Sequence, residues 1–296
     1  EGPDQLPLAA NGATFQRQDS RFGRDGKNWG VMAKLNVEEV ESTFGAYYRQ
    51  FDDYQPWLAP QIKAAAGSYR VVYPRGVKLA GVSFARVFNT VAVGSELSYR
   101  MNGALNATGV SALDDEGPRG DTIHFIANAV YGVPRNFISN NATLVGEFAY
   151  SHLQRVTEHE ELFKGVGKNA CTNARTPGIP GSGSESDGCS SKDYYAVAVN
   201  YTPQYISIFP SWDMDVPLTV NYGLHGNAPT AGGGSEGALA YSVGVKLTYA
   251  QLYEFGLRYA DTAAQPKNLA NGTVAGNGNV GGEDRGWLAF TFKTSF

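Results

Sequence analysis

Two pairs of opposite charges recur at a spacing of four residues, Glu96 with Arg100 and Glu254 with Arg258. Each pair lies in a run where small or polar residues alternate with apolar ones. Both members therefore fall on one face of an extended strand, about 13 Å apart. Because that distance is too long for a contact within the strand, we expect these charges to pair across strands. A ladder of this kind could select solutes in a polar lumen, or it could stiffen the wall as a salt-bridge network.

The same polar face carries further ionisable and amide side chains along the chain. If the alternating strands enclose a space, these residues face into it. We predict that this lumen is lined by Lys34, Arg49, Glu96, Arg100, Glu147, Asn200, Asn221, His225, Lys246, Glu254, Arg258 and Lys293.

Catalytic and metal-binding interpretations of the histidines are weaker. Ser151 and His152 are adjacent, so their side chains point to opposite faces of a strand and cannot form a dyad. His159 lies among glutamates, but nothing in their spacing fixes a metal geometry, and a solvated acidic run is the ordinary interpretation. We therefore predict no enzyme activity, no metal site and no cofactor, with a barrel-wall hydrolase as the weakest alternative.

Cys171 and Cys189 are the only cysteines, and they bracket a segment rich in Gly, Ser, Pro and Asn. Two thiols without a neighbouring histidine make a poor zinc site. In an oxidising compartment a disulfide would close this loop and contribute roughly 3 kcal/mol in the chain-entropy model. We predict that disulfide.

Strands with one apolar and one polar face must position the predicted lumen residues. In the last strand, an apolar face of Leu288, Phe290, Phe292 and Phe296 stands opposite Ala289, Thr291, Lys293 and Ser295. The same alternation predicts strands over 194–202, 216–225, 241–249 and 252–260, and less regular ones over 29–37, 42–51, 77–88, 91–102, 121–131 and 143–153. With the last strand, the count is about eleven.

The connections between these strands fall into two alternating classes. Short ones lie near 37–41, 89–91, 133–141, 203–213 and 249–251, and long polar ones near 53–76, 103–119, 156–192, 226–237 and 261–283. Large aromatic residues also stand at the ends of the apolar faces: Tyr99, Tyr131, Tyr201, Tyr222, Tyr249 and Tyr259. Both features favour a transmembrane barrel over a soluble sandwich or propeller.

We therefore predict an all-β fold, a transmembrane antiparallel β-barrel with about 11–12 strands in this chain. The barrel would occupy residues 27–296, after an N-terminal extension or loop at 1–26. The predicted number of strands is odd, and the first strand would begin on the extracellular side. This combination indicates that the chain is part of a larger barrel. Strands N-terminal to Glu1, one more strand within 1–26, or a second polypeptide would complete it.

Composition is compatible with this interpretation. The mean hydropathy is −0.29 and 18% of the residues are charged. No run reaches the ~18 apolar residues that a spanning helix needs, whereas a barrel strand needs an apolar residue only at alternate positions. With a net charge of −4 we expect no nucleic-acid partner.

Several short motifs occur in a familiar order: Tyr73-Pro74, Gly81-Val82-Ser83-Phe84, Gly94-Ser95-Glu96-Leu97-Ser98-Tyr99-Arg100, Phe209-Pro210-Ser211-Trp212-Asp213 and Asp284-Arg285-Gly286. From about Asp25 to Phe296 the chain resembles the C-terminal half of a large family of Gram-negative outer-membrane proteins classed as a domain of unknown function. Members are typically about twice this length. They are often encoded beside resistance-nodulation-division exporters and a periplasmic lipoprotein-like partner.

The resemblance implies a location in the bacterial outer membrane and the passage of hydrophobic or lipid-like compounds. It carries over no catalytic residues. A general solute porin and a structural component of an envelope complex are the alternatives. Expected partners are membrane lipids, lipopolysaccharide and envelope transport proteins.

Overall fold

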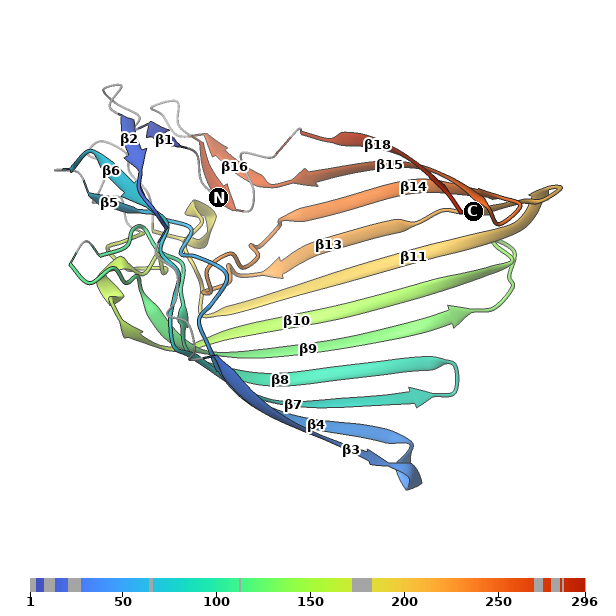
Figure 1. Cartoon of the computed structure of the whole chain (residues 1–296), viewed down its shortest axis with the longest axis horizontal. Helices are drawn as coiled ribbons and strands as arrows, with labels where there is room; N and C mark the ends of the chain where they lie inside the picture. The colour runs from blue at the N-terminus through green and yellow to red at the C-terminus, as the bar shows by residue number, and fades with distance from the viewer. Residues whose placement is uncertain are drawn as a thin grey trace.

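One large antiparallel sheet of twelve strands carries most of the chain (Figure 1). The computed structural model describes residues 4–7, 14–20, 28–63, 66–111, 113–171, 183–268, 274–277, 283 and 285–295. The strands of the large sheet are β3 (Trp29–Val37), β4 (Ser42–Phe51), β7 (Val77–Phe88), β8 (Val91–Ala104), β9 (Arg119–Val133), β10 (Asn141–Glu158), β11 (Asp193–Phe209), β12 (Trp212–Asp215), β13 (Leu218–His225), β14 (Leu239–Tyr249), β15 (Tyr253–Ala263) and β18 (Trp287–Thr294).

Each strand of this sheet pairs with its neighbours in the chain, from β3 at one edge to β18 at the other. β12 and β13 both pair with β11 and β14, so the twelve strands occupy eleven positions. Pro217 lies between them and lacks the N–H that a continuous ladder would use. The prediction of an all-β antiparallel fold with 11–12 strands is confirmed. The predicted connection at 203–213 is wrong, because β11 and β12 extend through it to a tight turn.

The connections lie at two ends of the sheet. Tight turns at one end, here called the turn end, join β7 to β8, β11 to β12 and β14 to β15, and they use left-handed residues such as Asn89 (φ 55°) and Ser211 (φ 64°). Short η1 (Glu38–Val40) joins β3 to β4 at the same end. The described parts of the long connections gather at the opposite end, here called the loop end (Figure 1). These connections are 52–76, 105–118, 159–192, 226–238 and 264–286.

Side chains of the long connections pack together at the loop end. Trp57 is 1% exposed and clusters with Val72, Ala104 and Val110, and its ring N–H donates to the Pro118 carbonyl at 3.1 Å. A second buried cluster joins Leu105, Leu153 and Phe163. The main apolar core therefore lies among loops at one end rather than between two layers of sheet.

Smaller elements complete the loop end. A four-stranded sheet has the order β1 (Gln5–Pro7), β2 (Thr14–Arg17), β6 (Ser68–Arg70), β5 (Gln61–Lys63), and β16 (Gln265–Asn268) pairs with β17 (Val274–Asn277). Two further 3-10 turns are η3 (Glu160–Leu162) and η4 (Glu185–Asp187). The described part of 1–26 thus joins a separate small sheet and adds no strand to the large one.

The large sheet is strongly curved but open. In the part of the chain that the structure describes, β3 and β18 each have one neighbour, and no pairing joins them. The predicted terminal residue of the apolar face, Phe296, lies outside the described residues. No helix among the described residues has the length and apolar character needed to cross a membrane.

Candidate functional site

The convex face of the sheet is apolar between two polar rims. On β7 this face carries Ala80, Val82 and Phe84, with Lys78 at the loop end and Arg86 at the turn end. The eight residue steps from Lys78 to Arg86 span about 26 Å along the strand. If the strand is tilted by about 40° from the barrel axis, the apolar band between these charges is roughly 20 Å high. Val82 is 55% exposed, so this apolar surface is bare rather than packed against another layer.

Aromatic side chains and carboxylates mark the loop-end rim of the convex face. The hydroxyls of Tyr150 and Tyr259 donate to Asp193 at 2.7 Å and to Asp261 at 2.9 Å. The six predicted interfacial tyrosines all lie on this face, although Tyr201 lies at the middle of β11 rather than at a strand end. Acidic groups on the convex face are thus confined to its rim in the described chain.

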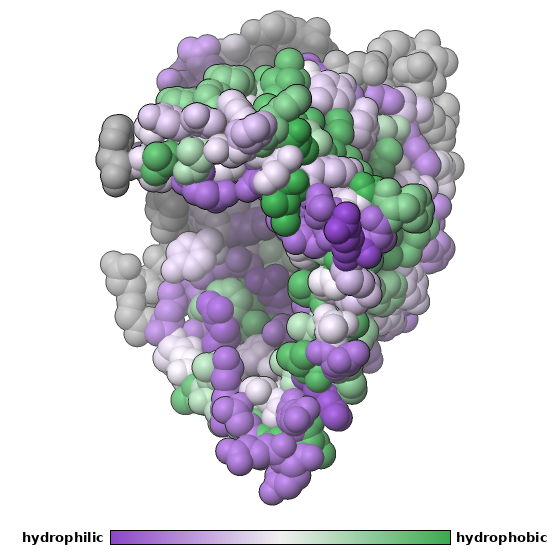
Figure 2. Space-filling model, turned by 90° about the vertical axis from the view of Figure 1, so that its right-hand side faces the viewer, coloured by the Kyte–Doolittle hydropathy of each residue, from purple (hydrophilic) through white to green (hydrophobic). Residues whose placement is uncertain are grey.

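The opposite, concave face encloses a deep hollow (Figure 2). Strand register places eleven of the twelve predicted lumen residues on it: Lys34, Arg49, Glu96, Arg100, Glu147, Asn200, Asn221, Lys246, Glu254, Arg258 and Lys293. Four strands share one row at Lys34, Gly45, Ser83 and Glu96, which shows how regular the alternation is.

His225 is the exception, and its predicted position was wrong. A bulge in β13 shifts the register, so that Gly223 pairs with Ala196 while His225 pairs with Tyr195. Tyr195 belongs to the convex face, and its ring lies 6.0 Å from the His225 ring. The His225 ring also contacts Glu236 at 3.2 Å, at the loop-end rim. The extra residue at a bulge reverses the face that simple alternation assigns.

Glu96 is held by a tyrosine that reaches over a neighbouring strand. The Tyr47 hydroxyl on β4 donates to Glu96 on β8 at 2.7 Å and crosses β7 at Gly81. A Cβ at Gly81 would lie 2.3 Å from the Tyr47 ring. Glycine is therefore required at this position by close packing rather than by backbone flexibility.

Arg100 takes its partner from a loop rather than from a strand. Its guanidinium donates to Asp53 at 2.6 Å, just beyond the end of β4, and both side chains are largely shielded from water. The expected pairing across strands is thus wrong for Arg100. The contact instead ties the concave wall to the connection 52–76.

At the turn end, concave-face charges pair across strands as expected. Lys246 lies 2.7 Å from Asp215 and 3.9 Å from Glu254, and Lys293 lies 3.1 Å from Glu254. Four strands thus contribute to a charge-balanced network. Farther along the face, Asn200 donates to the Thr219 hydroxyl at 2.9 Å.

Other charges on the concave face have no carboxylate or cation against them among the described residues. Lys34 and Glu147 belong to this group. Arg49 stacks on the Phe51 ring at 4.1 Å, and Arg258 lies 5.6 Å from the Trp287 ring. Guanidinium over an aromatic ring is attractive but leaves the positive charge uncancelled.

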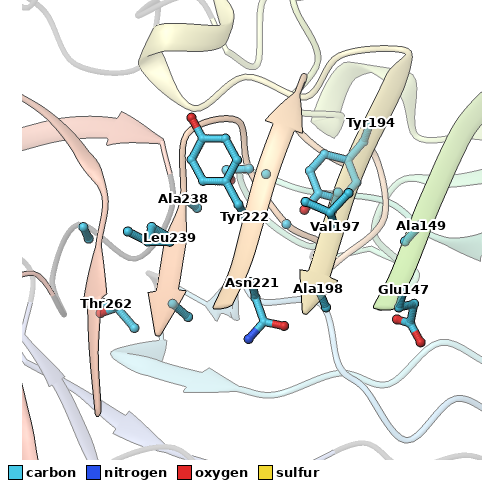
Figure 3. A pocket seen from close by; sticks show the side chains of 16 residues that line it. Glu147, Ala149, Tyr194, Val197, Ala198, Asn221, Tyr222, Ala238, Leu239 and Thr262 are labelled. Carbon is cyan, nitrogen blue, oxygen red and sulfur yellow. The ribbon is translucent and has the colours of Figure 1, made fainter. Parts of the chain in front are cut away.

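A cavity of about 340 Å³ lies where the connection 226–238 folds over the concave face (Figure 3). Its walls are mainly small residues on neighbouring strands: Ala149, Ala196, Ala198 and Ala240. We call it the alanine hollow. Glu147, Asn221 and Tyr194 supply its polar groups, and Gly234 lets the loop approach the Tyr194 hydroxyl.

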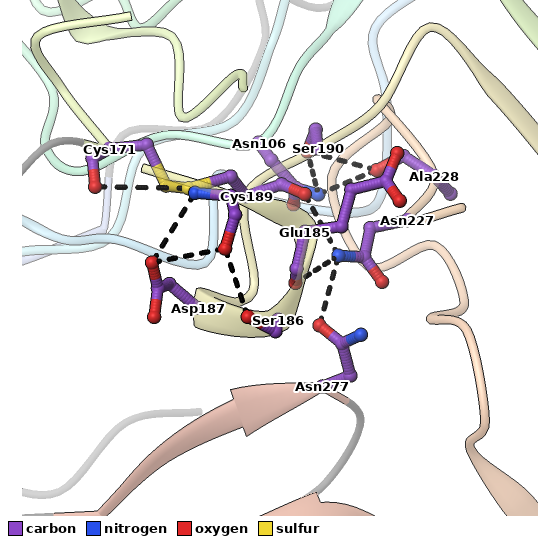
Figure 4. Close-up of a disulfide and its surroundings, with 11 residues drawn as sticks. Asn106, Cys171, Glu185, Ser186, Asp187, Cys189, Ser190, Asn227, Ala228 and Asn277 are labelled. Atoms are coloured by element: carbon purple, nitrogen blue, oxygen red, sulfur yellow. Dashed lines mark hydrogen bonds between the residues drawn. A yellow bond between two sulfur atoms is a disulfide. The ribbon is translucent and has the colours of Figure 1, made fainter. Parts of the chain in front are cut away.

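The predicted disulfide joins Cys171 to Cys189 at the loop end (Figure 4). Asn227 anchors the same region, because its amide donates to the carbonyls of Glu185 and Cys189 and to the Asn277 side chain at 2.8–3.0 Å. One amide therefore links three connections. Residues 172–182, inside the disulfide loop, lie outside the described residues.

His159 bridges two connections at the loop end. Its ring nitrogens lie 2.9 Å from Asp114 and 3.1 Å from Glu161, a geometry that needs the doubly protonated ring. Burial alone would lower the pKa of His159, but hydrogen bonds and charge from the two carboxylates raise it. In the described residues, no group of three or more metal-binding side chains is assembled.

Ser151 and His152 lie on opposite faces, as predicted. Ser151 pairs with His124 on the concave side, whereas His152 is on the convex side and contacts Asp193 at 2.7 Å.

A family model described as "Protein of unknown function (DUF1302)" matches residues 2–296. The chain belongs to this family. Comparisons with curated proteins and with solved structures found no match.

In this DUF1302 chain some of the recognised motifs contribute residues to the concave face, whereas Phe209–Asp213 forms the turn between β11 and β12. Gly81 and Ser83 lie on β7 and Glu96 on β8, where they form or flank the contact with Tyr47. Arg285 reaches the concave face beside Trp287, while its motif neighbour Asp284 lies outside the described residues. The sequence did not indicate the roles of Asn227, Asp53 or Arg285, because contacts between loops follow no period.

Proposed function

We propose that this chain forms the wall of a bacterial outer-membrane β-barrel whose lumen passes hydrophobic or lipid-like compounds. The apolar convex band carries this proposal. Soluble monomers rarely expose apolar patches above a few hundred Å². Here bare side chains such as Leu257 (49% exposed), Leu288 (66%) and Phe290 (68%) continue from strand to strand. Acyl chains would cover this band, and the tyrosine–carboxylate rim would lie among lipid headgroups.

The concave face supports lipid-like cargo over free ions. Charges at the turn end cancel within the Lys246–Asp215–Glu254–Lys293 network, and Asp53 balances Arg100. The alanine hollow offers a small-residue surface that suits an alkyl group better than a hydrated ion. A general porin is the second candidate, favoured by the unpaired Lys34 and Glu147 on the same face.

Topology supports completion of the wall by further strands. β3 and β18 both run from the loop end to the turn end, so a direct pairing between them would be parallel. Unpaired N–H and C=O groups at either edge are costly in hydrocarbon. An all-antiparallel closure therefore needs an odd number of additional strands, from the same polypeptide or from a second one.

Two measurements on the full chain reconstituted with phospholipid test the transport proposal. We expect extracted material to carry bound lipid, detectable by mass spectrometry, and planar bilayers to show little conductance. Large conductance that scales with salt, with no bound lipid, would instead establish a porin. A protein that stays in the aqueous phase would refute membrane insertion altogether.

Closure is tested separately with Val31→Cys and Phe290→Cys on the two edge strands. We expect no intramolecular cross-link between them, and intact-mass spectrometry of the barrel extracted from membranes should detect the additional strands. An efficient cross-link within a chain of 296 residues would contradict the parity argument.

A further inference from the structure

Two concave-face arginines, Arg258 and Arg285, have no carboxylate against them in the described part of the chain. Both line a cavity of about 500 Å³, here called the arginine hollow, and Trp287 lines it with them. Arg258 lies 5.6 Å from the Trp287 ring. Two arginines and one indole therefore line the same hollow.

Neutral groups in the arginine hollow can also donate. Thr219 accepts the Asn200 amide at 2.9 Å, which leaves its own hydroxyl hydrogen available. Asn221 and Ser242 line the hollow, and neither has a hydrogen bond to a described side chain. Ser242 is buried, Thr219 is half-buried and Asn221 is exposed, and their polar groups could donate to an acceptor bound in the hollow.

An acidic residue lines the same hollow, but among the described residues no ion pair joins it to either arginine, so the lining has two arginines against one carboxylate. Asp261 stands at its rim, and its two carboxylate oxygens accept the Tyr259 hydroxyl at 2.9 Å and the Thr262 backbone N–H at 2.8 Å. The Tyr241 hydroxyl lies 3.5 Å from the same carboxylate. Its oxygens are thus engaged by neutral donors at the convex rim.

The arginine hollow adjoins the alanine hollow. Asn221, Ala240 and Thr262 line both cavities. Glu147 is the acidic residue of the alanine hollow, and the strand register places it level with Thr262, four strands away. At the normal spacing between strands, the distance from Glu147 to Thr262 is about 19 Å. That separation exceeds the Debye length of about 8 Å, so its charge acts weakly on an anion beside the arginines.

From this arrangement we propose that the two hollows form one binding site for an amphiphile with an anionic head group. The carboxylate or phosphate lies between Arg258 and Arg285, and the alkyl chain lies along the alanine hollow. The inference rests on the proposed function and names its substrate class.

Binding of 9,10-dibromostearate to the full chain in dodecyl maltoside tests this assignment. Bromine quenches nearby indole, so the Trp287 contribution to quenching, isolated by comparison with Trp287→Phe, reports occupancy. In the double variant Arg258→Gln/Arg285→Gln we expect the Kd to rise tenfold or more, because hydrogen bonds to charged groups are lost. Arg49→Gln is the matched control, since Arg49 also lies over an aromatic ring on the concave face, and its Kd should stay within twofold.

Three ligands define the chemistry. Dodecyl phosphate should compete with dibromostearate, whereas 9,10-dibromostearyl alcohol and inorganic phosphate should bind at least tenfold more weakly. Unchanged affinity in the double variant, or equal affinity for the acid and the alcohol, would overturn the head-group assignment. Inorganic phosphate competing as well as dodecyl phosphate would also overturn it, because the alkyl part would then contribute nothing.

The test separates this inference from the proposed function. If the chain binds the ligand through its arginines but does not enter bilayers, the binding-site proposal stands and the membrane-barrel proposal is refuted. Arg258→Lys/Arg285→Lys keeps both charges, and restored affinity in that variant would confirm that the charges, rather than a folding defect, account for the loss.

Discussion

Leu257→Arg measures whether the convex face lies against lipid. Leu257 pairs with Val245 and Phe290, and Val245 is four residues from both Tyr241 and Tyr249 on its strand. Leu257 is therefore about 13 Å of strand from either aromatic rim, near the middle of the apolar band. A cation at the midplane of a transmembrane barrel costs about 2–4 kcal/mol, so the folding equilibrium should fall roughly 30- to 700-fold.

Urea titration of the chain refolded in phospholipid vesicles, followed by heat-modifiable gel mobility, gives this free energy. Thr291→Arg, on the concave face of the adjacent strand, is the face control and should change stability little. Tyr253→Arg, at the turn-end rim, is the depth control and should cost about 0–1 kcal/mol. Equal effects of Leu257→Arg and Thr291→Arg would refute our assignment of the two faces.

Three further perturbations test the loop end and the concave wall. Cys171→Ser/Cys189→Ser opens a loop with a sequence separation of 18 and should lower the free energy of unfolding by about 3 kcal/mol, measured by denaturant titration under non-reducing conditions; no change would show that the loop is held by its hydrogen bonds alone. Gly81→Val places methyl groups where the Tyr47 ring lies and should destabilise by about 1–3 kcal/mol, measured by the same titration. Equal loss in a Tyr47→Ala background, which lacks the ring, would contradict a steric cause. His159 has a raised pKa, so its bridge stabilises the loops while the ring is protonated and is lost as the pH rises through that pKa. The carboxylates of Asp114 and Glu161, whose pKa values are lowered, stay ionised and keep the bridge until the pH is more acidic. Proteolysis of the loops should therefore increase above the His159 pKa in the wild type, and a His159→Gln variant should lack that increase.

The strands were predictable because alternation with period two is a local signal. It placed eleven of twelve concave-face residues correctly and failed at His225, where a bulge inserts one residue. Pro217, which the alternation placed inside a strand over 216–225, lies instead just before β13. Both failures are local departures from regular geometry, and they leave no trace in the hydrophobic pattern.

The loop-end contacts were not predictable in the same way. Asp53 balances Arg100, and Asn227 joins segments up to 50 residues apart in the sequence. Such contacts depend on which loops meet above the sheet. Only the disulfide gave a signal in advance, because cysteine is rare in this chain and the two flank a single loop.

The distribution of charge on the concave face argues for a docked ligand rather than a stream of ions. At the turn end, Lys246 and Lys293 each lie against a carboxylate. Such pairs act as dipoles, and beyond a Debye length of about 8 Å their attraction for a mobile ion is small. Among the described residues, no carboxylate pairs with Arg258 or Arg285, which line the cavity that adjoins the alanine hollow. An ion path would need weak sites along its whole length, whereas two of the wall's cations, Arg258 and Arg285, line a single hollow next to its small-residue surface, an arrangement that suits the anionic amphiphile proposed above.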